Sequence, residues 1–221
     1  MNRTKDGLSR KRAVSMVINL LLFLFTVYGV SLFFYRGGDG NMQVFGSRCF
    51  HFFTVDSNIL AALAGIILFV FEVRTLRTGD MLPRWAVVLK MVATVAVAVT
   101  FFTVMLFLGP VFGFRGMFAG ANFFMHLVSP LLAMISLCVL ENREPLRFRA
   151  TFLGLLPTFI YGIVYVYEVF FSRGWPDYYG FGFLGHWTIV AAVMLIATYI
   201  LCILLWGLRK ALGKERAKVS A

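Results

Sequence analysis

Charged residues are scarce in this 221-residue chain: only 14% are Asp, Glu, Lys or Arg, whereas 60% are hydrophobic. The mean hydropathy is +0.84. A soluble domain of this length cannot bury so much apolar surface, which excludes the soluble globular classes. Apolar stretches of about 20 residues predict six transmembrane helices, at about residues 14–35, 50–71, 86–108, 119–140, 149–171 and 185–207. The expected fold class is all-α: a polytopic membrane protein whose residues 1–221 form one bundle of six transmembrane helices.

Acidic residues are scarcer than basic ones, with 10 Asp and Glu against 21 Lys and Arg, a net charge of +11. A basic patch would suggest nucleic-acid binding, but these residues alternate with the predicted helices. Sixteen lie in the two tails and in the loops after the second and fourth helices, four lie in the other three loops, and Lys90 lies just inside the third helix. The positive-inside rule then places both termini in the cytoplasm. We therefore expect a multi-pass protein of the cell membrane that contacts membrane lipids and no nucleic acid.

Cysteine is rare, and Cys49, Cys138 and Cys202 form no spaced motif. We expect no disulfide and no zinc-type metal site. The chain also lacks a P-loop, a GxSxG elbow and an HExxH motif, so no cofactor is expected. The first apolar stretch is too long for a cleaved signal peptide, and no small-x-small site precedes Arg36.

Polar residues gather where the second predicted helix begins, in the segment HFFTVDSN. His51, Thr54 and Asn58 are spaced i, i+3 and i+7, which places them on one face of a helix. Asp56 points elsewhere, roughly 140° away from His51. Under the predicted topology these residues lie in the outer leaflet, with Thr54 only ~6 Å below the helix start.

The fourth predicted helix carries a similar set in the segment GANFFMHLVSP. Asn122, His126 and Ser129 are spaced i, i+4 and i+7 and share a face, with His126 ~10 Å deep. Pro130 has no N–H to donate to the carbonyl of His126, so we expect a kink that opens room beside the histidine. An ionisable group within a span is by default a functional candidate, and His126 is the strongest one.

The fifth predicted helix approaches the same leaflet from the cytoplasm. Its polar stripe consists of Pro157, Tyr161, Tyr165 and Glu168. The loop that follows is rich in aromatic residues, and we interpret its Trp175, Tyr178 and Tyr179 as an interfacial belt.

Two interpretations of the polar residues stay open. The inner half of the bundle holds little beyond Asn19 and Ser136, so the polar residues that need an explanation are the outer ones. Asn, Ser and Thr within spans often only bond neighbouring helices, and this reading competes with a functional one for Asn58, Asn122 and Ser129.

Two of these segments resemble a known family. FFTVDSN and NFFMHLVSP are similar to motifs of the six-span androgen-induced-gene family and its bacterial relatives, and the loop segment GWPDYYGF is similar to the bacterial pattern. The matching residues are Phe53, Thr54, Ser57, Asn58, His126 and Pro130. Animal members are threonine hydrolases of fatty-acid esters of hydroxy fatty acids, and by position the resemblance implies catalytic roles for Thr54 and His126. This chain departs from the animal pattern at Phe123 and Leu127.

The chemistry of such a pair is simple. A neutral imidazole can take the proton of a threonine hydroxyl and activate it as a nucleophile toward an ester. We therefore predict that Thr54 and His126 face each other across a cavity that opens outward. Glu168 or Tyr165 should line its wall, and a lipid-like ester is the candidate substrate.

Supporting roles follow from residue type. Amide donors from Asn58 or Asn122 would stabilise an oxyanion, and Glu168 or Asp56 would orient His126. Two alternatives to a hydrolase stay open: a small transporter or channel with a His/Glu relay, and a non-catalytic membrane scaffold or sensor. The sequence leaves the substrate and the oligomeric state open.

Overall fold

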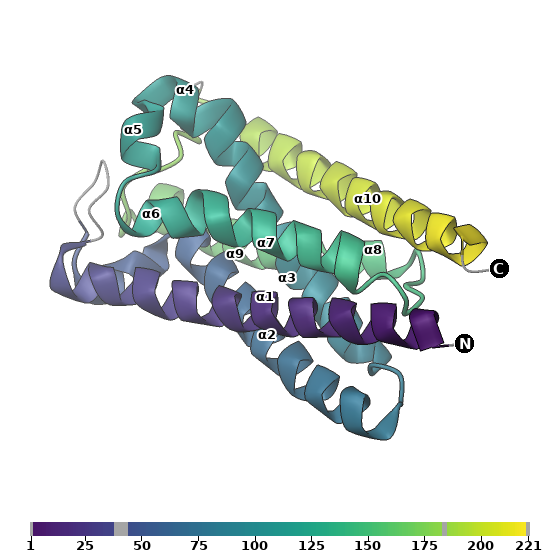
Figure 1. The fold of residues 1–221 in the computed structure, drawn as a ribbon. Helices are drawn as coiled ribbons and strands as arrows, with labels where there is room; N and C mark the ends of the chain where they lie inside the picture. Colours follow the sequence, from purple (N-terminus) through teal and green to yellow (C-terminus); the bar gives the residue numbers. More distant parts are fainter. Residues whose placement is uncertain (1, 38–43, 183–184, 220–221) are drawn as a thin grey trace.

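The computed structural model describes residues 2–37, 44–182 and 185–219, and these contain helices and no strand. Six of the helices are long and apolar enough to cross a membrane, as a multi-pass membrane protein requires. They are Arg10–Tyr35, Phe53–Thr78, Arg84–Phe112, Ala121–Leu140, Ala150–Phe171 and Trp187–Gly213. The start of α1 and the end of α10 lie at the same end of the bundle (Figure 1), as an even number of spans requires. The expected all-α class is confirmed.

Three spans lie within single helices and three are built from several segments. The continuous ones are α1 (Asn2–Tyr35), α2 (Phe53–Thr78) and α10 (Trp187–Val219). The third span comprises α3 (Arg84–Thr103), η3 (Val104–Leu108) and α4 (Gly109–Phe112). The fourth comprises α6 (Ala121–Phe123), η4 (Phe124–Val128), α7 (Ser129–Ile135) and η5 (Ser136–Leu140). The fifth comprises α8 (Ala150–Leu153), α9 (Leu156–Val166) and η6 (Tyr167–Phe171). The short helices η2 (Gly46–His51) and α5 (Phe114–Met117) lie in connections.

Proline explains two of the irregular segments. The π-helical segment η4 directly precedes Ser129 and Pro130, and the π-helical segment η3 directly precedes Gly109 and Pro110. Because proline has no N–H, the ordinary i to i−4 bond is missing, and the chain makes a wider turn instead. The irregularity that we expected beside His126 is therefore a π-helical turn with His126 at its centre.

The second span begins later than the sequence indicates. Residues 46–51 form the 3₁₀-helix η2, and α2 starts only at Phe53. His51 therefore lies outside α2 and does not share a helical face with Thr54, contrary to the expected spacing. At its other end α2 continues to Thr78, where Gly79 stops it in a left-handed conformation with φ 78°.

The core of the bundle is layered. An apolar layer of mostly small residues joins α1, α2, α3 and α7: Leu22, Ala61, Ala64, Ala93, Val97 and Ala133. Small residues let the helices approach closely. Along each of these spans, buried polar residues lie on both sides of this layer, for example Asn19 and Thr26 on either side of Leu22. One polar set lies toward the end of the bundle that is distant from the termini, and the other lies toward the termini.

Candidate functional site

Thr54 and His126 lie within hydrogen-bonding distance. The Thr54 Oγ1 atom, in the first turn of α2, is 3.3 Å from His126 Nε2 in η4. His126 is 6% exposed, and its other ring nitrogen, Nδ1, lies 2.7 Å from the carbonyl oxygen of Met117. A carbonyl only accepts, so Nδ1 carries a proton and, in the neutral ring, Nε2 is free to accept from the Thr54 hydroxyl. This is the tautomer that a base acting on Thr54 requires.

The partner that orients His126 is a main-chain oxygen. Met117 ends the short helix α5, and its carbonyl holds the imidazole. The Glu168 carboxylate instead accepts a hydrogen bond of 2.7 Å from the Ser172 hydroxyl. Asp56 lies exposed in the first turn of α2. The Met117 carbonyl thus takes the place for which we expected a carboxylate.

The side chain of Asn58 uses its amide N–H groups to bind main-chain carbonyls, one of them in a neighbouring helix. It is fully buried, and its amide nitrogen donates to the carbonyl oxygens of Thr54 at 2.8 Å and Met125 at 3.1 Å. An amide has two N–H groups, so neither remains for an oxyanion. Asn122 instead makes one long hydrogen bond, from its amide nitrogen to the carbonyl of Gly116 at 3.4 Å. The structure therefore separates two residues that sequence spacing treated alike.

The remaining neighbours of Thr54 come from α2 and α3. The Ser57 hydroxyl lies 2.9 Å from the hydroxyl of Thr100 and 3.1 Å from the carbonyl of Thr54. Among the described residues, the buried oxygens Asn58 Oδ1 and Ser129 Oγ have no hydrogen-bond partner. We call Thr54, Ser57, Asn58, Thr100 and His126 the outer polar site.

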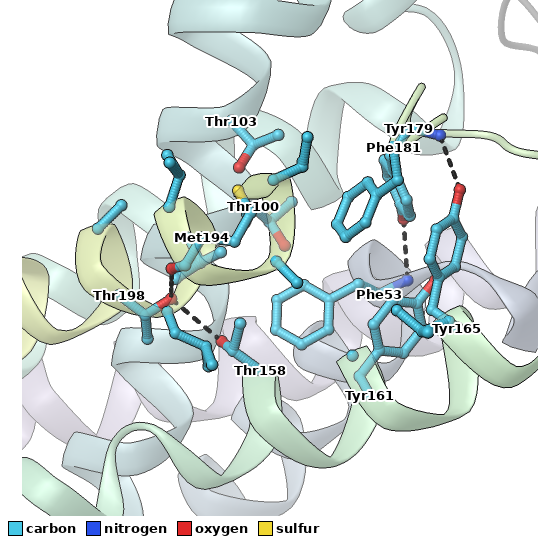
Figure 2. Close-up of a pocket in the computed structure, with 18 of the residues that line it drawn as sticks. Phe53, Thr100, Thr103, Thr158, Tyr161, Tyr165, Tyr179, Phe181, Met194 and Thr198 are labelled. Carbon is cyan, nitrogen blue, oxygen red and sulfur yellow. Dashed lines mark hydrogen bonds between the residues drawn. The ribbon is translucent and has the colours of Figure 1, made fainter. Parts of the chain in front are cut away.

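A cavity of about 900 Å³ adjoins this site, and Thr54 is one of its lining residues. The cavity lies between the start of α2, α3 with η3, α9 with η6, and α10 (Figure 2). Most of its lining is apolar, and lining residues such as Leu106, Ile163 and Val193 are also exposed on the surface. The cavity therefore opens sideways, where the surface is apolar. Tyr165 lines the cavity as expected, whereas Glu168 and His126 are not among the lining residues. Thr54 and His126 are therefore in direct contact rather than facing each other across a cavity, and the cavity opens sideways rather than outward as we expected.

Tyr179 points into the protein, although we expected it in an interfacial belt. Its hydroxyl accepts a hydrogen bond of 3.0 Å from the backbone N–H of Phe53, and its own backbone N–H donates to the Tyr165 hydroxyl at 3.0 Å (Figure 2). Burial raises the pKa of Tyr179 to about 12, so its hydroxyl stays protonated at neutral pH. Tyr179 also lines the cavity.

Other reactive groups near the site are few. Cys49 is a buried free thiol, and burial, followed by the negative charge of Asp56, raises its pKa. A raised pKa keeps this sulfur in the unreactive thiol form. Within the described residues, no group of three or more His, Cys, Asp and Glu side chains is arranged to hold a metal ion.

The polar set nearer the termini is larger than the sequence indicates. We call it the inner polar cluster: Ser15, Asn19, Glu72, Lys90, Ser136 and Glu141. Each of these side chains is at least 98% buried. Asn19 lies at its centre, since its amide nitrogen donates to Glu72 at 3.3 Å and to Glu141 at 3.0 Å, while its oxygen accepts from Lys90. The Lys90 ammonium also lies 3.9 Å from Glu141.

One signal for this cluster was present in the sequence. Lys90 lies inside an apolar stretch, where a charge needs a partner. Glu72 and Glu141 lie just beyond the ends of their predicted spans, at positions that normally face water. Only the close approach of α1, α2, α3 and η5 turns these ends inward.

Comparison with protein-family models, curated proteins and solved structures gave no match.

Proposed function

We propose that this chain is an intramembrane hydrolase of lipid-like esters, with Thr54 as the nucleophile and His126 as the general base. The observation that carries the proposal is the contact of 3.3 Å between Thr54 Oγ1 and His126 Nε2, together with the Met117 carbonyl that sets the tautomer. The resemblance to the androgen-induced-gene family agrees with this pair.

The reaction has two halves. His126 Nε2 takes the proton of Thr54 as Oγ1 attacks the ester carbonyl carbon, and the imidazolium then gives that proton to the departing alcohol. The acyl group is now an ester on Thr54. Water attacks this ester while Nε2 takes a proton from it, and the carboxylic acid leaves as Thr54 regains its hydroxyl proton. Asn122, which we expected as a donor for the oxyanion, is not among the residues that line the cavity, so it offers no N–H to an oxyanion formed there.

The cavity supports an apolar ester as the substrate class. Its volume of about 900 Å³ is within the range of small-molecule sites, and its lining is mostly hydrophobic. Because it opens sideways through exposed apolar residues, an ester dissolved in the bilayer would enter without passing through water. Thr54 at the cavity wall would meet the ester group.

The orientation of the protein is part of the proposal. The bias of sixteen basic residues against four favours cytoplasmic termini and an outer polar site in the outer leaflet. Ser47 and Asp80 are exposed at opposite ends of the bundle, and the three natural cysteines are buried. In whole cells, an impermeant maleimide should label Ser47→Cys, and should label Asp80→Cys only after permeabilisation. The reverse pattern would contradict the orientation.

A fluorescent serine-hydrolase phosphonate tests the hydrolase proposal on purified protein in mild detergent. Wild type should be labelled, Thr54→Ala should not, because the nucleophile is gone, and His126→Ala should not, because the base is gone. Thr54→Ser should retain labelling, since it keeps the hydroxyl. Equal labelling of wild type and Thr54→Ala, with both folded by thermal melt, would refute the proposal.

A small transporter with a proton relay is the second candidate, and the inner polar cluster is the observation that favours it. Buried Glu72, Lys90 and Glu141 provide ionisable groups in the half of the bundle opposite His126. The apolar layer separates the two halves, so transport would require that layer to open. Proton uptake by proteoliposomes under an imposed gradient distinguishes this candidate from a hydrolase.

A further inference from the structure

We propose that Tyr179 is a positioning residue for Thr54: its hydroxyl holds the first turn of α2 so that the Thr54 hydroxyl meets His126. Tyr179 belongs to the loop of residues 174–182, which is part of the segment between η6 and α10. What this inference says about the reaction rests on the proposed function, whereas what it says about the Thr54–His126 contact does not.

The first turn of α2 has no cap of its own. Phe52 is the N-cap residue, and no side chain of the cap position makes a capping bond. The first N–H groups of a helix have no partner within the helix, so they need one from elsewhere. The Tyr179 hydroxyl accepts from the N–H of Phe53 at 3.0 Å, and Phe53 directly precedes Thr54. Tyr179 therefore acts as a remote cap, from 126 residues away in the sequence.

Tyr179 is itself held in place. Its backbone N–H donates to the hydroxyl of Tyr165, a fully buried residue of α9. The Tyr165 hydroxyl in turn donates to the Asp177 carboxylate at 2.7 Å. That carboxylate also accepts from the N–H groups of Phe181 at 2.9 Å and Gly182 at 2.7 Å. The hydrogen bond to Tyr165 thus fixes the loop against α9, and the bond from Phe53 to Tyr179 fixes the start of α2 against the loop.

The same loop packs along the residues that lead into α2. Trp175 stacks on His51 with ring centroids 4.4 Å apart and planes 16° apart. The ring of Tyr178 contacts that of Phe52 at 4.5 Å. Because Tyr179, Gly180 and Phe181 line the cavity, the loop forms part of its wall (Figure 2), and Thr54 lines the same cavity. The loop that holds the first turn of α2, and with it Thr54, is therefore also the loop that shapes this part of the cavity.

The neighbouring tyrosine supplies a matched control. Tyr179→Phe keeps the ring and removes only the hydroxyl that accepts from Phe53. Tyr178→Phe makes the same chemical change one residue away, where the ring packs on Phe52. A general effect of losing a hydroxyl from this loop would appear in both variants, whereas a capping effect appears in Tyr179→Phe alone.

The test is ¹⁵N NMR of protein labelled at its three histidines, with His126→Gln used to assign the His126 signals. Thr54→Val provides the Nε2 signal of an imidazole that has lost its hydrogen bond. Tyr179→Phe should move the His126 Nε2 signal most of the way toward the Thr54→Val position, and Tyr178→Phe should leave it at the wild-type position. A wild-type signal in Tyr179→Phe, with the protein folded by thermal melt, would overturn the proposal.

Phosphonate kinetics supply the second measurement. Tyr179→Phe should lower the maximal inactivation rate roughly tenfold, as expected for a misplaced nucleophile, with the half-saturating probe concentration unchanged. A moved Nε2 signal with an unchanged inactivation rate would contradict the positioning role. If wild type itself is not labelled, the hydrolase proposal fails, and the NMR result still decides whether Tyr179 sets the Thr54–His126 contact.

Discussion

The outer polar site and the inner polar cluster are both buried between the same helices, but their surroundings differ. Thr54 of the outer site lines the cavity of about 900 Å³, and no residue of the inner cluster does. The inner cluster contains formal charges of both signs that are paired with each other and with Asn19. In the outer site the Thr54 hydroxyl contacts the His126 imidazole, and Thr54, but not His126, borders the cavity. A cavity beside the Thr54 hydroxyl is what a substrate needs to reach a reactive group. An ionic network that borders no cavity is instead what a structural role in stabilising the bundle requires.

This comparison predicts its largest effect at Lys90. Lys90→Met removes the ammonium and leaves Glu72 and Glu141 buried without it, which should lower the free energy of unfolding by about 3–5 kcal/mol. Denaturant titration in mild detergent measures this loss. Adding Glu141→Gln should recover part of it, and Lys210→Met, at an exposed lysine, should have little effect. A stable Lys90→Met protein would show that the inner cluster is not a stability element.

A smaller loss of stability is expected at Asn58. Asn58→Ala leaves the buried carbonyl of Met125 without its donor, and the cost should be about 1–3 kcal/mol. Asn122→Ala is the matched control, because Asn122 is only half-buried and makes one long hydrogen bond of 3.4 Å. Thermal melts of both variants measure the difference. An equal loss in the two would contradict the assignment of Asn58 to helix packing.

Glu168 should have the smallest effect of all. Its carboxylate is bound by Ser172 and lies outside the cavity lining, so Glu168→Gln should change the rate of phosphonate labelling by less than about twofold. The rate of fluorescence incorporation measures it. A loss as large as that of His126→Ala would mean that the carboxylate acts on the imidazole, and would contradict the assignment of that role to the Met117 carbonyl.

The sequence was enough to predict the spans and the meeting of Thr54 with His126. Span length and apolar composition determine the first. The second rested on similar depth in two helices that enter from the same side, and on the resemblance to a known family. Helical spacing could not distinguish Asn58 from Asn122, because the direction of each amide depends on which neighbouring carbonyl it meets. The sequence also could not predict which oxygen orients His126, because every residue has a main-chain carbonyl and nothing in the residue type marks the one at Met117.

For Tyr179 and Lys90, the sequence showed the residue but could not predict its partners. A tyrosine in an aromatic loop is usually interfacial, and only the return of that loop onto α2 brings the Tyr179 hydroxyl to Phe53. Lys90 was visible as a charge within a span, but its partners, Asn19 and Glu141, come from two other parts of the bundle. Contacts between residues so far apart in sequence depend on how the helices pack, which apolar periodicity alone does not specify.

The most direct test of the central claim is to locate a covalent adduct. Purified wild type should be treated with the phosphonate, digested, and analysed by tandem mass spectrometry, with Cys49→Ser and Thr54→Ala treated alongside. The account predicts one adduct, on the Oγ1 atom of Thr54, that is retained in Cys49→Ser and absent from Thr54→Ala. An adduct on any other residue, or none on folded wild-type protein, would contradict the claim that Thr54 and His126 form a nucleophile and its base.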